Sequence, residues 1–270
     1  MNITTLLDKV YFAPRLKKID FYANRAGELQ HRVLDRLVRM AENTEWGKKY
    51  DYKSIHTYED FRNRLPIQTY EEVKPYVERL RAGEQNLLWP SEIRWFAKSS
   101  GTTNDKSKFL PVSKESLNDT HYQGGKDAVA LYLGQNPDSR FFSGQGLILG
   151  GSHSPNLNSR HGLVGDLSAI LIQNIHPLVN CVRVPSKKIA LMSDFEKKIE
   201  AIANSAVSKD VTSLSGVPSW MLVLIKRILE KTGKQSLEEI WPNLEVFFHG
   251  GVAFNPYREQ YKEVIRSPKM

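Results

Sequence analysis

The sequence predicts an α/β or α+β fold in which layered mixed sheets are flanked by helices. Three observations support this prediction: several segments have apolar residues at helical spacing, short apolar runs lie between them, and capping residues mark helix ends. A chain of 270 residues can bury roughly three-quarters of its unfolded surface. No repeat period or linker composition divides the chain, so we expect one continuous domain over residues 1–270.

The expected helices follow from apolar spacing and capping signals. An amphipathic helix is predicted over residues 20–40, and a second helix follows the capping box Thr69-x-x-Glu72 and ends near Gly83. Further helices are predicted over residues 113–132, weakened or kinked at Gly124-Gly125, near residues 166–172, after the box Ser193-x-x-Glu196, over residues 220–231 behind a Ser219 cap, and after Ser236-x-x-Glu239.

The expected strands are short and apolar. They cover residues 93–97, 109–112, 147–149, 211–214 and 244–248. A polar loop joins the first two strands, and Ser152 to His161 forms another loop. The strand over residues 244–248 places His249-Gly250-Gly251-Val252 at its carboxyl end.

Composition and charge exclude several classes of protein. The hydrophobic share of 40% and the charged share of 25% are those of a globular chain, and no apolar stretch is long enough to span a membrane. The single Cys181 excludes an internal disulfide and a thiolate zinc cluster, and with no secretory leader we expect a cytoplasmic protein. The net charge of +8 is scattered among acidic residues, so we expect no nucleic-acid partner, although a small polyanion such as ATP remains compatible.

The densest chemical signal is the polar loop from Lys98 to Lys108. Its hydroxyl groups, its glycine and its lysines are what a polyphosphate ligand requires: hydroxyl and backbone donors together with mobile positive charge. An exposed polar hairpin is the alternative interpretation. The loop is not a Walker-type P-loop, because Asp105 rather than glycine precedes Lys106-Ser107 and no helix is expected there.

The loop Ser99-Ser100-Gly101-Thr102-Thr103, with Lys108 and Phe109-Leu110-Pro111-Val112 after it, resembles the phosphate-binding loop of adenylate-forming enzymes. More narrowly, the chain resembles the auxin-responsive Gretchen Hagen family of acyl acid amido synthetases over essentially its whole length. Further segments carry this resemblance in the same order: Tyr58-Glu59-Asp60-Phe61, Leu65-Pro66-Ile67, Tyr70-Glu71-Glu72, Pro75-Tyr76, Gly83-Glu84, Val217-Pro218-Ser219-Trp220 and Gly250-Gly251-Val252.

The resemblance implies a two-step reaction with ATP and Mg²⁺. A small carboxylic acid attacks the α-phosphate to give an acyl adenylate, and an amino acid then displaces AMP to form an amide. It implies that Ser99, Ser100, Gly101, Thr102 and Thr103 bind the phosphates and that Lys108 adds a catalytic positive charge. No protein metal ligand is expected.

The resemblance also implies ligand contacts near the end of the chain. Gly250, Gly251 and Val252 would receive the adenine, because absent side chains let a planar ring approach the backbone; a tight turn is the alternative. Val217 and Pro218 would wall an apolar acid pocket together with residues 220–224, for which buried core is the alternative. Neither the acid, the amine nor the oligomeric state is indicated.

The chain departs from the family pattern in two places. Asn104-Asp105 stands where related loops have a small residue and glycine, so an acidic side chain lies beside the expected phosphate site. The later family motifs, a Tyr-led segment with Glu, a ribose-binding Asp and a small C-terminal lobe, do not follow Val252. We therefore expect the chain to be the N-terminal part of the large domain of such a synthetase.

The sequence suggests three alternative functions. A truncated, non-catalytic paralogue that binds nucleotide or an acyl acid is the main alternative. An esterase is suggested by His249-Gly250-Gly251, which resembles an oxyanion-hole segment, but no Gly-x-Ser-x-Gly follows it. A metal hydrolase would need His153, His161 and His176 to converge, and their spacing matches no helical ligand pair.

Overall fold

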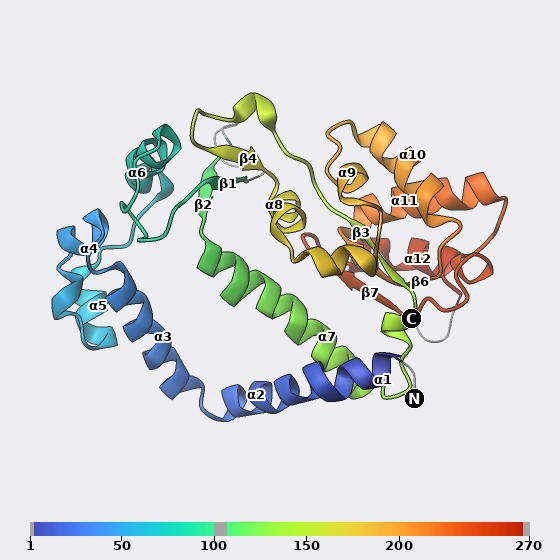
Figure 1. Cartoon of the computed structure of the whole chain (residues 1–270), viewed down its shortest axis with the longest axis horizontal. Helices are drawn as coiled ribbons and strands as arrows, with labels where there is room; N and C mark the ends of the chain where they lie inside the picture. The colour runs from blue at the N-terminus through green and yellow to red at the C-terminus, as the bar shows by residue number, and fades with distance from the viewer. Residues whose placement is uncertain (1–2, 100–106, 267–270) are drawn as a thin grey trace. The chain divides into compact units, whose positions relative to one another are not determined.

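The computed structural model describes residues 3–99 and 107–266 (Figure 1). These residues fall into two compact units. Unit 1 comprises residues 1–13, 130–153 and 167–270, and unit 2 comprises residues 14–129 and 154–166. Helices combined with one parallel and one mixed sheet confirm the predicted α/β class. The prediction of a single domain over residues 1–270 stays a prediction.

Unit 1 is built on a parallel sheet with the strand order β5-β3-β6-β7. The register pairs Leu147 of β3 with Val184 of β5 and with Leu214 of β6, and it pairs Leu214 with Phe247 of β7. The four strands are β3 (Gln145–Leu149), β5 (Arg183–Val184), β6 (Val211–Gly216) and β7 (Val246–His249).

One face of this sheet carries the main core of unit 1. Side chains of one face alternate with those of the other along a strand, so Leu147, Leu214 and Val184 share a face. Helices α10 (Phe195–Ala206) and α11 (Pro218–Thr232) lie side by side (Figure 1) and contribute Ile202, Leu224 and further buried side chains to the same core. Trp241 is fully buried there and donates from its indole nitrogen to the carbonyl of Ala206.

The remaining helices of unit 1 are shorter. They are α1 (Ile3–Leu7), α8 (Leu167–Asn174), α9 (Lys187–Ala190), α12 (Arg258–Val264) and the brief 3-10 or π segments η1 (Asp8–Phe12), η4 (Phe141–Ser143), η6 (Pro177–Cys181), η7 (Leu237–Glu239) and η8 (Asn255–Tyr257).

Two helix caps in unit 1 differ from those predicted. Asp194, not Ser193, caps α10, because its carboxylate accepts from the backbone N–H of Lys197. Helix α11 begins at Pro218 rather than after Ser219, since the fixed φ of proline suits the first helical position. The segment after Ser236 is a 3-10 turn, η7, instead of an α-helix.

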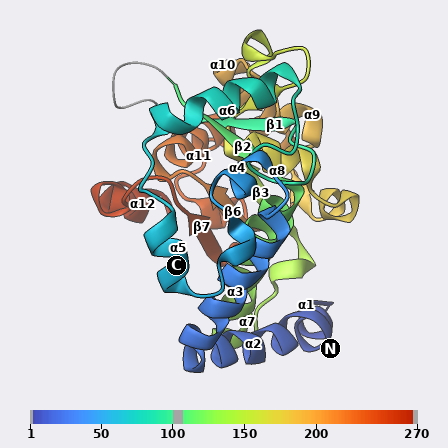
Figure 2. The same ribbon diagram turned by 90° about the vertical axis from the view of Figure 1, so that its left-hand side faces the viewer.

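Unit 2 packs helices beside a small sheet with the order β2-β1-β4. Strand β1 (Trp95–Lys98) is antiparallel to β2 (Phe109–Val112) and parallel to β4 (Leu163–Gly165). Helix α6 (Tyr70–Ala82) lies along the β1–β2 hairpin (Figure 2), and its Val77 and Leu80 pack with Phe96 in a small core. The Thr69 capping box and the left-handed Gly83 cap of α6 are both confirmed.

A second small core of unit 2 is formed with α3 (Ala26–Ala41), α4 (Glu45–Lys49), η2 (Tyr52–Ser54) and α5 (Tyr58–Arg64). Val38, Tyr52 and Ile55 are buried there. The other helical segments in this part of the chain are α2 (Ala13–Asn24), η3 (Ser116–Tyr122) and η5 (Pro155–Leu157). The division between the units falls inside α7 (Gln123–Gln135).

Two helical predictions in this part of the chain need correction. The single helix expected over residues 20–40 is divided at Arg25, whose φ of −132° is not helical, so that α2 and α3 are separate. The irregularity expected at Gly124-Gly125 lies just before these glycines, where the π-helix η3 widens the turn and continues into α7.

Within the described residues, none of the helices combines the length and the apolar character that crossing a membrane requires.

Candidate functional site

The first candidate site is the base of the β1–β2 hairpin in unit 2, from which the predicted phosphate loop emerges. The backbone N–H of Ser99 donates to the carbonyl of Lys108 at 3.0 Å, and the N–H of Lys108 donates to Oγ of Ser99 at 3.3 Å. These two bonds close the hairpin beyond the last paired residues, Lys98 and Phe109. The two ends of the loop are therefore fixed next to each other.

Helix α6 supports the same hairpin. The hydroxyl of Tyr70 accepts from the N–H of Phe109 at 2.9 Å, and the Lys108 ammonium lies 5.5 Å from the centre of the Tyr70 ring. Arg81 lies over the Phe109 ring at 4.0 Å. The face of an aromatic ring attracts a cation, so Tyr70 helps to place the half-buried Lys108 side chain at the loop base.

The predicted phosphate-binding residues Ser100, Gly101, Thr102 and Thr103 lie outside the described residues, together with Asn104 and Asp105. Among the residues of this loop that are predicted to act on the phosphates, the described part contains Ser99 and Lys108, which the hairpin brings into direct contact. Their roles toward a phosphate stay predictions.

The second candidate site is the carboxyl edge of the parallel sheet in unit 1. Strand β3 ends before Gly150-Gly151, β6 ends before Val217-Pro218 and β7 ends before Gly250-Gly251. From β3 the chain continues to β5 on one side of the sheet, and from β6 it continues to β7 on the other side. In open α/β sheets ligands bind at such a reversal of strand order, at the carboxyl ends of the strands.

The predicted adenine-side and acid-side residues meet at this edge. Gly251 has φ +85°, a left-handed conformation that favours glycine, and a methyl group added there would lie 3.2 Å from Cγ2 of Val217. The space beside Gly250 is open to at least 4 Å, and Val252 is 44% exposed. Gly251 therefore has the backbone conformation of the tight turn, which was the alternative interpretation, and the backbone beside it at Gly250 is open.

The acid-side helix is partly core and partly surface. Met221, Leu222 and Leu224 are buried in the main core of unit 1, which confirms the alternative interpretation for these residues. Trp220 and Val223 are exposed by 41% and 48%. Pro218 is buried at the start of α11, and its carbonyl accepts from the hydroxyl of Tyr261 at 2.8 Å.

Sequence reasoning missed Lys198, which is only 1% exposed. Its ammonium on α10 donates to the carbonyls of Gly150 and Gly151 and to Oγ of Ser152, at the carboxyl edge of the sheet. The sequence contains a signal for this burial. Position 198 is three or four residues away from Phe195 and Ile202 and next to Ile199, so it lies on the apolar face of α10.

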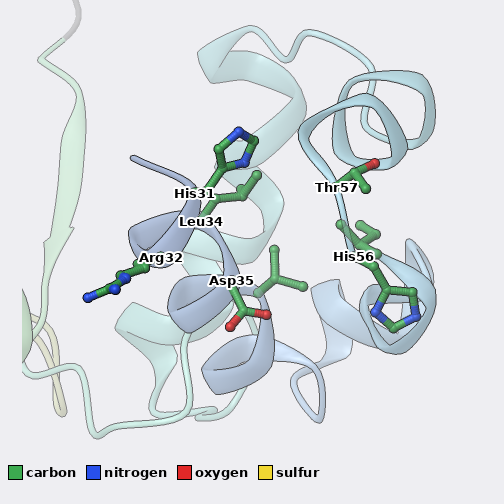
Figure 3. A pocket seen from close by; sticks show the side chains of 8 residues that line it. His31, Arg32, Leu34, Asp35, His56 and Thr57 are labelled. Atoms are coloured by element: carbon green, nitrogen blue, oxygen red, sulfur yellow. The ribbon is translucent and has the colours of Figure 1, made fainter. Parts of the chain in front are cut away.

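The structure also contains a hollow of about 240 Å³ in unit 2 (Figure 3). His31, Leu34 and Asp35 of α3 border it on one side, and His56 and Thr57 border it on the other. Two of its charged groups are already paired, Arg32 with Glu28 and Asp35 with Arg39. The hollow is smaller than the roughly 300 Å³ typical of small-molecule sites and contains no predicted site residue.

A groove of about 650 Å³ runs between α10 and α11 in unit 1. Glu200 in its wall forms ion pairs with Arg227 and Lys231, each at 2.7 Å. The hydrogen bond from Lys231 has the largest effect and that from Arg227 the next, and together they lower the pKa of Glu200 from 4.5 to about 2. Val223, from the stretch predicted to wall the acid pocket, lines this groove, whereas Val217 and Pro218 do not. Arg227 in the same wall is paired with Glu200 and with Glu230.

The histidines considered for a metal site have other surroundings. The His161 ring lies beside Gly83, where an added methyl group would approach its Cδ2 to 2.7 Å. His176 accepts from the N–H of Leu178 through Nδ1 at 3.3 Å. Within the part of the chain that the structure describes, no three His, Cys, Asp or Glu side chains gather closely enough to hold a metal ion.

Comparison with known proteins agrees with these observations. The chain is 30% identical over 103 residues to the indole-3-acetic acid-amido synthetase GH3.2 of Arabidopsis thaliana. The aligned stretch covers 38% of this chain and 19% of that enzyme. It is 26% identical over 106 residues to the jasmonoyl-L-amino acid synthetase JAR4 of Nicotiana attenuata. This aligned stretch covers 39% of this chain and 18% of that enzyme.

A solved structure shows the same fold. The GH3.15 acyl acid amido synthetase in complex with 2,4-DB superposes with a TM-score of 0.71 and 17% identity, covering 87% of this chain and 50% of that one. The chain thus spans about half the length of this solved enzyme. The model of the GH3 family N-terminal domain matches residues 15–270. Because this match includes nearly the whole chain and the fold agrees with a GH3 enzyme, the chain belongs to the GH3, or Gretchen Hagen, family.

Proposed function

We propose that this chain acts in ATP-dependent acyl acid amido synthesis, by holding the ATP phosphates at the β1–β2 hairpin and the acyl acid at the carboxyl edge of the parallel sheet. A carboxylate oxygen attacks the α-phosphorus of ATP, the bond to the bridging oxygen breaks, and pyrophosphate leaves. The nitrogen of an amino acid then attacks the acyl carbon, AMP leaves with the electron pair, and the amine loses a proton as the amide forms.

The observation that carries this proposal is the hairpin base in a chain of the GH3 family. The backbone of Lys108 is hydrogen-bonded to the backbone and the hydroxyl oxygen of Ser99 at the two ends of the predicted phosphate loop, and the Lys108 ammonium lies 5.5 Å from the centre of the Tyr70 ring. Preordered donors and a positive charge stabilise negative charge that develops on departing pyrophosphate. Ser100, Gly101, Thr102 and Thr103 would supply the remaining donors.

The acid and the adenine are assigned to the carboxyl edge of the sheet in unit 1. Val217 offers an apolar side chain beside Gly251, and the open backbone at Gly250 and Val252 suits a flat ring. The substrate classes are proposed from relatives, whose names give indole-3-acetic acid, jasmonate with amino acids, and 2,4-DB.

Mg²⁺ would be held mainly by the phosphates, as is usual for nucleotide enzymes, and it would neutralise charge on the departing pyrophosphate. The described residues at the loop base would supply the Ser99 hydroxyl and the Lys108 cation to the phosphates that carry the metal. Accordingly we assign no protein residue to the metal.

The acidic Asp105 beside the expected phosphate site is compatible with a second candidate function. A non-catalytic paralogue that binds nucleotide or an acyl acid would use the same two sites without completing the reaction.

The test measures ATP binding by calorimetry and acid-dependent exchange of pyrophosphate into ATP, with indole-3-acetate, jasmonate and 2,4-DB as probes. Lys108→Ala is expected to weaken ATP binding by roughly tenfold to a hundredfold, because it removes a charged partner of the phosphates. Lys114→Ala, an exposed lysine just after β2, is the matched control and should leave binding unchanged.

Each outcome decides between the candidates. Binding together with exchange supports the synthetase, whereas binding without exchange in the full-length protein supports the non-catalytic paralogue. A wild-type chain that binds neither ATP nor any of the acids contradicts both. If Lys108→Ala binds ATP as tightly as wild type, Lys108 has no role at the phosphates.

A further inference from the structure

Lys198 is a charged side chain in the interior of unit 1. It lies on α10, its side chain is 1% exposed, and its backbone N–H bonds normally to the carbonyl of Asp194. Taking an ammonium group out of water is costly unless its donors find acceptors. A buried lysine on a core helix therefore points to a structural or functional task for its charge.

The Lys198 ammonium has three N–H donors, and three acceptors of one loop receive bonds from it. It bonds to the carbonyl of Gly150 at 3.2 Å, to the carbonyl of Gly151 at 3.0 Å and to Oγ of Ser152 at 2.8 Å. Ser152 in turn donates to the carbonyl of Met192 at 2.6 Å. One side chain thus fixes three consecutive residues directly after β3.

The same loop is held from its other side by α8. Because a peptide unit is planar and trans, a carbonyl that points to Lys198 turns the next N–H in the opposite direction. The N–H of Gly151 accordingly donates to Oγ of Ser168 on α8 at 2.8 Å. A methyl group added at Gly150 would lie 2.8 Å from Cδ1 of Ile172, so α8 also sets how closely the backbone packs.

This loop is one side of the strand-order reversal. Strand β3 lies next to β6, and a methyl group added to Gly216 at the end of β6 would come within 2.9 Å of the Leu149 carbonyl. The Gly150–Ser152 loop therefore follows β3 at the point where Val217 follows β6. Ligand sites of parallel sheets open between such neighbouring strand ends.

We infer that Lys198 is a positioning residue that fixes the Gly150–Ser152 loop as one wall of the acyl acid site, opposite Val217. Lys198 acts through the loop backbone and through Ser152, and it does not touch the acid. This inference rests on the proposed function, because it takes the acyl acid to bind at the carboxyl edge of the sheet.

The experiment compares Lys198→Met with wild type in the full chain. Methionine keeps most of the length and volume of the side chain but removes its charge and donors. We expect amide exchange of residues 150–152 to accelerate. We also expect the affinity for the most tightly bound acid of the proposed screen to fall roughly tenfold, as expected for losing about one well-formed interaction, while ATP affinity changes little. Where turnover is measurable, KM for the acid rises more than kcat falls.

One further variant keeps the test decisive if Lys198→Met does not fold. Ser152→Ala retains the buried charge and removes one acceptor together with the bond to Met192, so a smaller loss of acid affinity in the same direction is expected. Where Lys198→Met folds, the double variant Lys198→Met/Ser152→Ala should lose less acid affinity than the sum of the two single losses, because both substitutions act on one loop. Lys197→Met, at a neighbouring side chain that is 77% exposed, is the control and should change neither readout.

A purely structural role predicts a different result. In that case Lys198→Met and Ser152→Ala lower the stability but leave acid affinity unchanged below the unfolding transition, and the inference is wrong. Failure of the wild-type chain to bind any acid contradicts the proposed function instead. Amide exchange of the loop then still shows whether Lys198 fixes it, since that readout needs no ligand.

Discussion

At the scale of single residues, Arg183 in β5 is an unusual group. It is 5% exposed and lies on the opposite face of the sheet from Val184, which packs in the main core. Among the residues that the structure describes, Nε and Nη2 of its guanidinium have no hydrogen-bond acceptor. Burial lowers the pKa of Arg183 below its usual value, although a guanidinium retains its proton in proteins.

Replacing this guanidinium should therefore stabilise the protein. Arg183→Met keeps an apolar stem of similar length and removes two buried donors that lack acceptors, each of which costs about 1–3 kcal/mol. We expect the free energy of unfolding, measured by urea titration, to rise by about 1–3 kcal/mol. The exposed control Lys209→Met should change it by less than about 0.5 kcal/mol. A clear loss of stability in Arg183→Met would show that Arg183 has a partner.

At the scale of secondary-structure elements, the ends of α6 and α11 differ in one respect. Both helices end at a glycine in the left-handed region, Gly83 with φ +110° and Gly233 with φ +67°. A methyl group at Gly233 would have no neighbour within 4 Å, whereas one at Gly83 would approach the His161 ring to 2.7 Å. Gly83 thus serves both the helix cap and the packing of the segment before β4.

The two glycines form a matched pair for mutation. Gly233→Ala should cost about 1–2 kcal/mol, the usual penalty for a left-handed non-glycine residue. Gly83→Ala should cost at least about 1 kcal/mol more, because the His161 ring must also move. Adding His161→Ala to Gly83→Ala should recover part of that difference. Equal costs of the two single variants, measured by urea unfolding, would contradict the close approach.

The contact between α10 and α11 gives a pH-dependent prediction. The pKa of Glu200 is depressed to about 2 by Lys231 and Arg227, so its contribution to stability is present above about 4.5 and is lost as the pH falls toward 2. Glu200→Gln should therefore be less stable than wild type at neutral pH. The difference should shrink between these two pH values.

Urea midpoints of wild type and Glu200→Gln, measured across this pH window, give the comparison. Glu263→Gln, on the exposed side of α12, serves as the control for removing one carboxylate. A difference between wild type and Glu200→Gln that stays constant down to the lowest pH would mean that the ion pairs do not contribute to folding.

At the scale of the whole molecule, the order of strands in the parallel sheet of unit 1 predicts which strand is best protected from local unfolding. Strand β6 is hydrogen-bonded to β3 on one side and to β7 on the other, and its first four residues are buried. We expect the amides of residues 211–214 to exchange most slowly in unit 1, and those of the edge strand β7 to exchange faster. Hydrogen exchange measured by mass spectrometry tests this, and equally slow exchange in β7 would contradict it.

Local signals in the sequence predicted many elements correctly. The capping box of Thr69, the Gly83 cap, the β1–β2 hairpin and the strands β3 and β6 all depend on residues close together in the chain, and all are confirmed. The break at Arg25 and the cap at Asp194 were missed, since neighbouring candidate residues offer similar local choices there. The ordered motifs also identified the GH3 family correctly.

The candidate sites were predictable only in part. The sequence alone determined the α/β class, the family and the residues at the strand ends, because periodicity, capping and motif order are local properties of the chain. Only the tertiary structure decided that Val217 lies against Gly251, and that the ammonium of Lys198 bonds to the loop after β3. The reason is physical: these contacts join residues more than thirty positions apart, and the order of parallel strands, rather than local preference, brings them together.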